Sequence, residues 1–236
     1  MIAAVLNAIL IFAGSAVGLL CKGKIKESRS NAVMIGLGLC VMMIGISGAV
    51  KTENILCVIV SMVIGIILGE VLRIEDRLDH LGELLRVKVL KGRESGRFTE
   101  GFMTASLMFC VGSMAIVGSM EAGIQHNYST ILSKSVIDCV TAVTFAATMG
   151  VGVLFSGAVI LIYQGALTLL AGVVEPYLSQ AVVTEMTAVG GILLIGTGIN
   201  ILGMTKKRVM VGNMLPAIFM PIGLLPLFKW LGTLFG

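Results

Sequence analysis

The chain has little charge. Only 13% of its 236 residues are charged, whereas 57% are hydrophobic, and the mean hydropathy is +1.03. One soluble core of this size cannot bury so much apolar surface, which excludes an ordinary soluble domain. Unpaired backbone groups in hydrocarbon cost several kcal/mol each, so segments that cross lipid must be helices. The composition predicts an all-α, polytopic membrane helix bundle, a single domain over residues 1–236 whose first partner is the lipid bilayer.

The chain also lacks the motifs of common enzymes and cofactor sites. It has no HExxH, no GxSxG and no Walker A sequence, so we expect no enzymatic activity of these kinds and no cofactor. Its five cysteines form no CxxC pair and have no histidine nearby, which indicates neither a zinc site nor a disulfide framework. The net charge of +4 reflects membrane topology, so no nucleic-acid partner is expected.

Long apolar runs separated by charged breaks predict eight transmembrane helices. A span needs about 20 apolar residues, and the block from Ser135 to Val174 is long enough for two, so length alone divides it at Ser156-Gly157. A re-entrant arrangement of this block is the alternative. The predicted spans are Ile2 to Leu20, Asn31 to Val50, Ile55 to Leu72, Gly101 to Met120, Ser133 to Phe155, Gly157 to Val174, Val182 to Leu202 and Val209 to Leu231.

The distribution of lysine and arginine predicts the orientation. Cytoplasmic loops carry the excess of basic residues, and eight spans with both termini outside place most of them inside. If Gly101 to Met120 were re-entrant, the last basic loop would move outside and the asymmetry would weaken. The basic residues expected inside are Lys22, Lys24, Lys26, Arg29, Arg73, Arg77, Arg86, Lys88, Lys91, Arg93, Arg97, Lys206, Lys207 and Arg208.

The longest polar segment, residues 73–100, is predicted to be a cytoplasmic amphipathic connector. Leu78, Leu81, Leu85 and Val89 recur at spacings of three and four among mixed charges, as on one face of a helix that lies on a membrane surface. A gate or docking element is the functional alternative to a plain interfacial connector.

A comparison of the chain with itself suggests a weak internal repeat. A shift of about 151 positions aligns Ile9-Leu10-Ile11-Phe12-Ala13-Gly14 with Ile160-Leu161-Ile162-Tyr163-Gln164-Gly165. The first three spans then match the last three, in opposite orientation, as in many transporters. This pattern favours an inverted repeat, and two unmatched spans between the copies raise the alternative that a homodimer completes the symmetry.

Asp138 is the clearest acidic residue inside a predicted span. A carboxylate at a helix centre costs roughly 2.5 to 3.5 kcal/mol on insertion scales, so such residues usually face the bundle interior or a wet pathway. Lys134 is one turn earlier and could neutralise it. Asp138 is therefore a candidate cation or proton site, with a structural ion pair near the outer interface as the alternative.

Uncharged polar residues and two interrupted helices add further candidates. Gly112 to Ser119 repeats Gly-Ser at an interval of six, and prolines 216, 221 and 226 should kink or break the last span. Broken helices expose backbone groups that can hold ions or polar solutes, although a packing kink is the alternative. With Asp138, the candidate residues for binding a small polar solute or cation are Asn7, Ser113, Ser119, Gln164, Asn200 and Asn213.

Several runs resemble a known family. Gly112-Ser113-Met114-Ala115, Lys134-Ser135-Val136-Ile137-Asp138, Tyr163-Gln164-Gly165 and Gly212-Asn213-Met214-Leu215-Pro216 are similar to the YqgA-like bacterial inner-membrane family, domain of unknown function 554. Cys139-Val140 depart from the small residue expected after the aspartate. The resemblance implies a multi-pass protein of the bacterial inner membrane, presumed to be a transporter, and supplies no catalytic residue or substrate.

Three functional classes are compatible with these features. A secondary transporter for a small polar solute or ion, linked to a cation or proton through Asp138, is the leading hypothesis. A channel or pore would use the same residues, and saturable, gradient-driven exchange would separate the two. A structural or regulatory membrane subunit is the third class.

Overall fold

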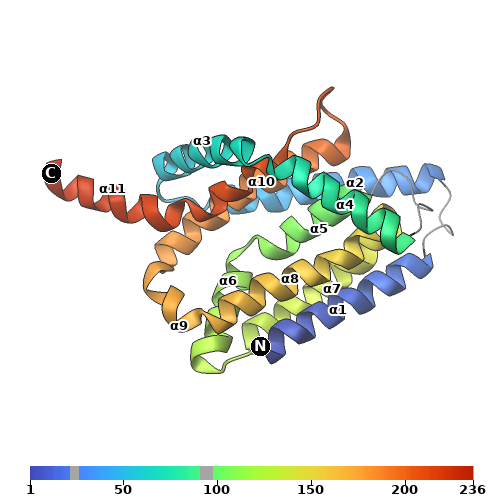
Figure 1. Cartoon of the computed structure of the whole chain (residues 1–236), viewed down its shortest axis with the longest axis horizontal. Coiled ribbons are helices and arrows are strands. Elements are labelled where there is room, and N and C mark those ends of the chain that lie inside the picture. Colours follow the sequence, from blue (N-terminus) through green and yellow to red (C-terminus); the bar gives the residue numbers. More distant parts are fainter. Residues whose placement is uncertain (22–26, 91–97, 236) are drawn as a thin grey trace. The chain divides into compact units, whose positions relative to one another are not determined.

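The computed structural model describes residues 1–21, 27–90 and 98–235, and the regular elements of these residues are helices (Figure 1). Of the basic residues that carry the orientation argument, Lys22, Lys24, Lys26, Lys91, Arg93 and Arg97 lie outside the described residues, as do the side chains of Leu81, Leu85 and Val89. The elements are α1 Ile2–Cys21, α2 Glu27–Ala49, α3 Ile55–Val71, α4 Ile74–Leu90, α5 Phe98–Cys110, α6 Ser113–Met120, η1 Glu121–Gln125, α7 Ser129–Met149, α8 Gly152–Leu169, α9 Ala171–Val174, η2 Glu175–Tyr177, α10 Gln180–Leu202, η3 Val211–Phe219 and α11 Pro221–Phe235.

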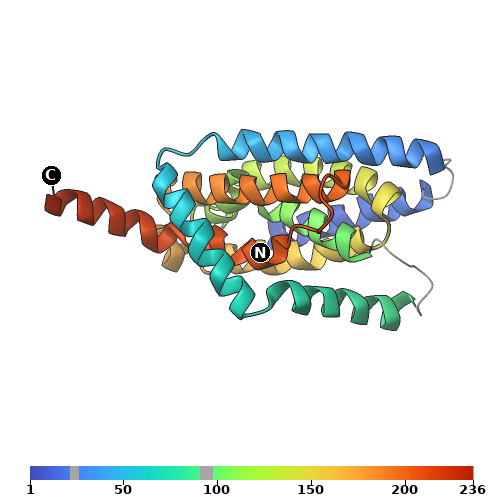
Figure 2. The ribbon, with the colours of Figure 1, turned by 90° about the horizontal axis from the view of Figure 1, so that it is seen from above.

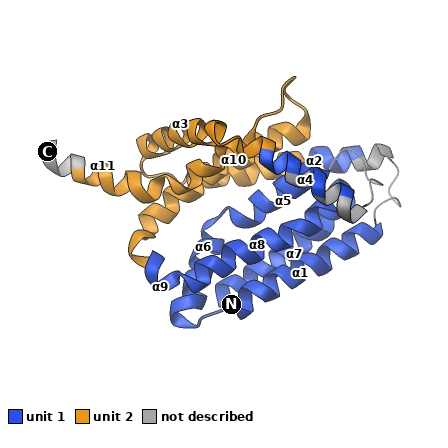
Figure 3. Cartoon of the chain, in the orientation of Figure 1, with its two compact units in different colours: residues 1–37, 77–174 blue, residues 38–76, 175–236 orange. Residues whose placement is uncertain are grey.

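The chain divides into two compact units, coloured separately in Figure 3. Unit 1 comprises Met1–Leu37 and Arg77–Val174, and unit 2 comprises Gly38–Asp76 and Glu175–Gly236. Both units are therefore built from segments far apart in the sequence. Unit 1 contains α1, α5, α6, α7 and α8, while unit 2 contains α3, α10, η3 and α11.

The prediction of an all-α membrane bundle is confirmed. Among the described residues, five helices are long and apolar enough to cross a membrane: α1, α2, α7, α8 and α10. Three further pairs meet the same criteria as bent spans, which brings the number to as many as eight. The bent pairs overlap the predicted third, fourth and eighth spans, and the first of them also includes Ile74–His80 of the predicted connector. The inverted repeat is not confirmed.

The predicted boundary between the fifth and sixth spans is wrong. Helix α7 ends at Met149 and α8 begins at Gly152, six residues before the predicted division at Ser156-Gly157. The reason is Gly150, which has φ of 90°, a left-handed conformation open mainly to glycine. Gly157 instead lies within α8, where it packs beneath the ring of Phe12. The length of the apolar block predicted two spans, but it could not predict that the turn between them is at Gly150.

The predicted interruptions in the fourth and last spans are confirmed. Helices α5 and α6 with η1 are bent by 56°, and Gly112 at the break has φ of 125°. Among the described residues, apart from its chain neighbours, no atom lies within 4 Å of a Cβ built on Gly112, so the backbone conformation, and not a lack of space, favours glycine there. In the last span, η3 and α11 are bent by 47°. Pro221 begins α11, where the missing N–H costs no helical hydrogen bond.

The connector is a helix over its first part. Helix α4 covers Ile74–Leu90 and carries acidic residues in its first turn, which suits the positive end of a helix dipole. Within unit 1, Leu78 packs against a cluster of Phe98, Phe102 and Met103 from α5. The helical prediction for this segment is thus confirmed for residues 74–90, whereas residues 91–97 lie outside the described residues.

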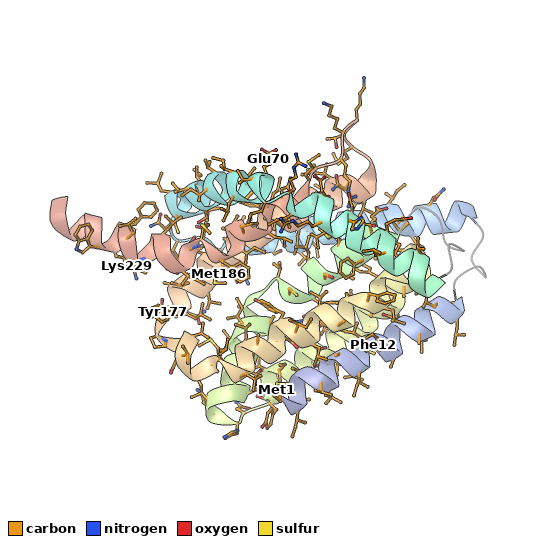
Figure 4. The ribbon with its side chains drawn as sticks, viewed as in Figure 1. Met1, Phe12, Glu70, Tyr177, Met186 and Lys229 are labelled. Carbon is orange, nitrogen blue, oxygen red and sulfur yellow. The ribbon has the colours of Figure 1, made fainter. Side chains whose placement is uncertain are left out.

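In unit 1, α1 packs in parallel with α7 and antiparallel to α8. Gly14 lies against Cys139 and Gly18 against Val143, so contacts advance together along α1 and α7. Contacts along α8 run in the opposite direction to those along α1, because Gly157 contacts Phe12 whereas Gly165 contacts Met1. Figure 4 labels Phe12 and Met1. The glycines allow the backbones to approach closely, as is typical of membrane helices.

In unit 2, the helices pack as antiparallel pairs. The second half of α2, from Gly38, belongs to unit 2. Its Gly45 lies against the backbone of Gly191 in α10, and this part of α2 runs beside α10 in Figure 2. Helix α3 packs in the same way on η3, where Gly65 contacts Ala217 and Gly69 contacts Asn213. Close backbone contact thus joins each pair.

Apolar side chains also cover outward faces of the helices, as expected for lipid exposure. On α3, a stripe of Ile59, Val63, Ile67 and Val71 repeats every four residues, and each side chain is at least half exposed. A soluble monomer rarely exposes a patch of this kind. These faces and the buried glycine contacts together fit helices that are solvated by lipid.

Candidate functional site

Four polar side chains from three helices meet in the interior of unit 1. Asn7 comes from α1, Lys134 and Asp138 from α7, and Gln164 from α8. Asn7 and Gln164 are 0% exposed, Asp138 is 5% exposed and Lys134 is 6% exposed. The stretch of α1 that supplies Asn7 lies between Met1 and Phe12, which Figure 4 labels. We call these four residues the polar cluster.

The helical repeat explains why α7 can supply both charges. Its buried residues recur at three- and four-residue spacing, so Lys134 and Asp138 lie on one inward face with Ile131 and Ala142. The ammonium and carboxylate form the predicted ion pair. Asp138 is nine positions after Ser129, the first residue of α7, which is about 14 Å at a rise of 1.5 Å per residue. It therefore lies midway along α7, not five residues into the span.

An amide chain extends from the ion pair. Asn7 Nδ2 donates to Asp138 Oδ2 at 3.1 Å and to Gln164 Oε1 at 2.9 Å. A carboxylate only accepts, so Asp138 determines which end of the Asn7 amide faces it, and Asn7 in turn determines the orientation of Gln164. Both donors of Asn7 Nδ2 are thus in use.

Two atoms of the polar cluster are left without a partner. Within the part of the chain that the structure describes, Asn7 Oδ1 and Gln164 Nε2 are buried and make no hydrogen bond. One is an acceptor and the other a donor. A buried polar group that makes no hydrogen bond costs about 1–3 kcal/mol, so two such atoms in adjoining side chains require an explanation.

Lys134 has a second neighbour. Its Nζ lies 6.0 Å from the centre of the Phe109 ring, and Phe109 is completely buried. An aromatic face attracts a cation at this range. The polar cluster therefore holds one positive and one negative charge, with a net charge of zero, against an apolar wall.

The Gly-Ser stretch contributes less than the sequence predicted. Ser119 is fully buried, but its hydroxyl donates to Ala115 O at 2.7 Å within the same helix. Ser113 follows the break at Gly112 and is half-buried at the start of α6. Neither serine has a hydrogen bond to the polar cluster among the bonds that the structure describes.

The two remaining candidates, Asn200 and Asn213, belong to unit 2 and bond within it. Asn200 accepts from Val209 N at 2.8 Å and donates to Val209 O at 2.9 Å, which closes the loop after α10. Asn213 Oδ1 accepts from Glu75 N at 2.8 Å. Each amide therefore holds a chain turn in position.

Two buried carboxylates of unit 2 escaped the sequence analysis. Glu185, 1% exposed, accepts from Thr52 Oγ1 at 2.6 Å, Glu53 N at 2.8 Å and Asn54 N at 3.0 Å. Glu75 accepts from Gly212 N at 2.5 Å. Glu185 lies in the first turns of α10, three residues after the start of the predicted span at Val182.

The polar cluster has the components of a ligand site but not of a multidentate metal site. Among the described residues, no group of three or more His, Cys, Asp or Glu side chains is placed to hold a metal ion. The fold and the polar cluster define a polytopic α-helical membrane protein with a buried, charge-paired polar site.

The chain belongs to the family described as "Protein of unknown function (DUF554)", whose profile matches residues 2–225. It is 30% identical over 225 residues to the "Uncharacterized membrane protein YdfK" of Bacillus subtilis (strain 168). The aligned residues make up 94% of this chain and 94% of that protein. It is 28% identical over 223 residues to the "Uncharacterized protein YqgA" of Escherichia coli (strain K12), covering 93% of this chain and 94% of that protein. No solved structure matches the chain. The resemblance noted from the sequence is confirmed.

Proposed function

We propose that the protein is a secondary transporter of a small polar solute or ion, linked to a cation or proton through Asp138. The observation that carries the proposal is the polar cluster: an ion pair buried midway along a membrane helix, next to two buried amide atoms that have no hydrogen-bond partner among the described residues. Such groups are expensive in a membrane, and they usually mark a substrate or ion pathway.

Unpartnered hydroxyl groups continue on both sides of the polar cluster. Thr168 is one turn beyond Gln164 on α8, and Ser15 is two turns beyond Asn7 on α1; both hydroxyls are buried and lack a partner among the described residues. Because α1 and α8 are antiparallel, these hydroxyls lie on opposite sides of the Asn7–Gln164 bond. This arrangement supports a polar route through unit 1 with the polar cluster in its middle.

The burial of the polar cluster favours alternating access over an open channel. Asn7 and Gln164 are completely buried, whereas a conducting pore would expose them to water. The proposed conformation is therefore occluded, and solute would enter after the helices around the polar cluster separate. The Lys134–Asp138 pair suits such a cycle, because a proton or cation that binds Asp138 would release the ammonium.

The helix directions support eight crossings. If α1 crosses the membrane once, a parallel α7 requires an odd number of crossings between them, which α2, α3 and the bent α5–α6 span supply. If α5–α6 were re-entrant, only α2 and α3 would cross the membrane between α1 and α7, and α7 would then be antiparallel to α1. With the basic loops inside, both termini lie outside, and the inner membrane is the proposed location.

The same packing supports the inverted repeat as a proposal. The repeat pairs α1 with α8, α2 with α10 and α3 with η3. The contacts within each pair are antiparallel, and those of α2 come from its residues in unit 2. Two copies of opposite orientation, related by a two-fold axis in the membrane plane, would bring equivalent helices together in this way.

Transport by proteoliposomes tests the proposal. Vesicles that contain the purified protein and an internal pH dye would be exposed to amino acids, organic acids, polyamines and alkali cations. We expect at least one compound to drive a saturable proton flux or counterflow. The flux should disappear in the double variant Lys134→Gln/Asp138→Asn.

The double variant controls for misfolding. Asp138→Asn alone would leave Lys134 buried without its counterion, which destabilises proteins by about 3–5 kcal/mol, whereas removal of both charges is often neutral. Circular dichroism and gel filtration would verify that the variant is folded. Flux that is absent for every compound, or that the folded double variant retains, would overturn the proposal.

A further inference from the structure

We infer that the polar cluster binds a small zwitterion, a solute that carries one ammonium and one carboxylate group. This inference rests on the proposed function and names its substrate class. The polar cluster itself holds one cation, Lys134, and one anion, Asp138. In a dry interior an uncompensated charge is costly, so a ligand of zero net charge leaves the total balanced.

The unpartnered atoms match the same ligand. Asn7 Oδ1 is an acceptor on the amide that already bonds Asp138. It is therefore suited, together with the carboxylate, to receive an ammonium group. Gln164 Nε2 is a donor and, like the ammonium of Lys134, can serve a carboxylate. A zwitterion would thus replace the internal ion pair by two ion pairs with the ligand, its ammonium with Asp138 and its carboxylate with Lys134. It would also supply partners to the two amide atoms that have none among the described residues.

Ligands with only one of the two charged groups satisfy half of the polar cluster. A simple amine would compete with Lys134 for Asp138 and leave an excess positive charge. A simple carboxylate would do the reverse. A neutral amide could bond Asn7 and Gln164, but it could not separate Lys134 from Asp138. The polar cluster therefore discriminates by charge pairing as well as by hydrogen bonding.

Small size follows from burial. Asn7 and Gln164 are both 0% exposed, and the helices around them are joined by glycine contacts such as Gly14 against Cys139. The smallest zwitterion, glycine, is the first probe. The matched half-ligands are methylamine, acetate and acetamide.

Thermal unfolding of the full-length, detergent-purified protein gives the test. A ligand that binds only the folded state raises the unfolding midpoint with its concentration. We expect glycine to raise it saturably and each half-ligand to have no effect at the same concentration. Lys134→Gln and Asp138→Asn should each weaken glycine binding by about tenfold or more, the usual contribution of a hydrogen bond to a charged group.

A charge-swapped variant separates binding from a merely structural role. Lys134→Asp/Asp138→Lys keeps one charge of each sign one turn apart, so it should bind glycine more tightly than either single variant. Glu175→Gln, on an exposed residue of η2, is the matched control and should bind as the unmodified chain does.

The two proposals fail in different ways. If methylamine or an alkali cation shifts the midpoint while glycine does not, and Asp138→Asn removes that shift, the zwitterion inference is overturned and the transport proposal stands. If none of the probes shifts the midpoint and no compound produces flux in proteoliposomes, both are overturned.

Discussion

Each unit contains a buried carboxylate, Glu185 in unit 2 and Asp138 in unit 1, and the two differ in the kind of partner that they bind. In unit 2, Glu185 is capped by one hydroxyl and two backbone N–H groups from the turn that precedes α3. In unit 1, Asp138 is paired with Lys134 and accepts a hydrogen bond from Asn7. The amides of Asn7 and Gln164 keep one acceptor and one donor without a partner in the described part of the chain. Glu185 therefore completes a turn, whereas Asp138 belongs to a group of side chains with unused hydrogen-bonding capacity.

The difference shows how to distinguish a structural from a functional buried charge. Backbone N–H groups at a helix start are orphaned until something accepts from them, so a carboxylate there satisfies a local need. Asp138 satisfies no such need, because the N–H groups around it bond within α7. Asp138 is compensated by the side chains of Lys134 and Asn7, which a ligand could replace, and this contrast can be tested by substitution.

The largest expected effect comes from breaking the ion pair on one side. Asp138→Leu leaves the Lys134 ammonium buried and unpaired, and it should lower the free energy of unfolding by about 3–5 kcal/mol. The double variant Lys134→Met/Asp138→Leu should recover most of that loss. Unfolding by SDS in mixed micelles, followed by circular dichroism, measures both. If the double variant lost as much free energy of unfolding as Asp138→Leu does, the ion pair would be necessary for folding, which would contradict our interpretation.

The next effect concerns the capped carboxylate of unit 2. Glu185→Ala removes the acceptor of Thr52 and two backbone N–H groups, and the loss should be about 2–4 kcal/mol. No second substitution is expected to rescue it, because the stranded donors include backbone groups. Glu175→Ala, an exposed glutamate of the same unit, should change stability by less than about 0.5 kcal/mol. Equal values for the two alanine variants would remove the capping role.

The smallest effects come from two hydroxyl groups. Thr52→Val removes a hydrogen bond to a carboxylate and should cost about 1–3 kcal/mol. Ser15→Ala removes a buried hydroxyl that lacks a partner among the described residues, so it should be neutral within about 0.5 kcal/mol or stabilising. The same SDS titration compares them. A large loss in Ser15→Ala would show that its hydroxyl is bonded and would weaken the proposed polar route.

Much of the fold could be predicted from the sequence. Apolar runs located all of the candidate spans, because lipid requires long apolar helices whatever their neighbours are. The breaks at Gly112 and near Pro221 were also foreseeable, since glycine and proline act on their own backbone. The turn at Gly150 was missed because apolar residues flank it on both sides, and hydropathy contains no signal for a turn within such a block.

The candidate site was predictable only in part. Asp138 and Lys134 are one helical turn apart, so their pairing follows from the chain itself. The bond of Asn7 to both Asp138 and Gln164 joins positions more than 130 residues apart. Asn200 and Asn213 looked equally suitable as ligands, and their bonds to Val209 and Glu75 appear only in the folded chain.

The sequence by itself determined that this is a helical membrane protein, roughly where its apolar spans lie, and that Lys134 and Asp138 are one turn apart within one of them. These properties depend on each segment's own transfer between water and lipid. The tertiary structure decided which polar groups are satisfied. It places Glu185 against a neighbouring turn, and it leaves one amide atom of Asn7 and one of Gln164 without a partner among the described residues. Hydrogen-bond satisfaction depends on which distant segments pack together, and close glycine contacts between helices determine that packing.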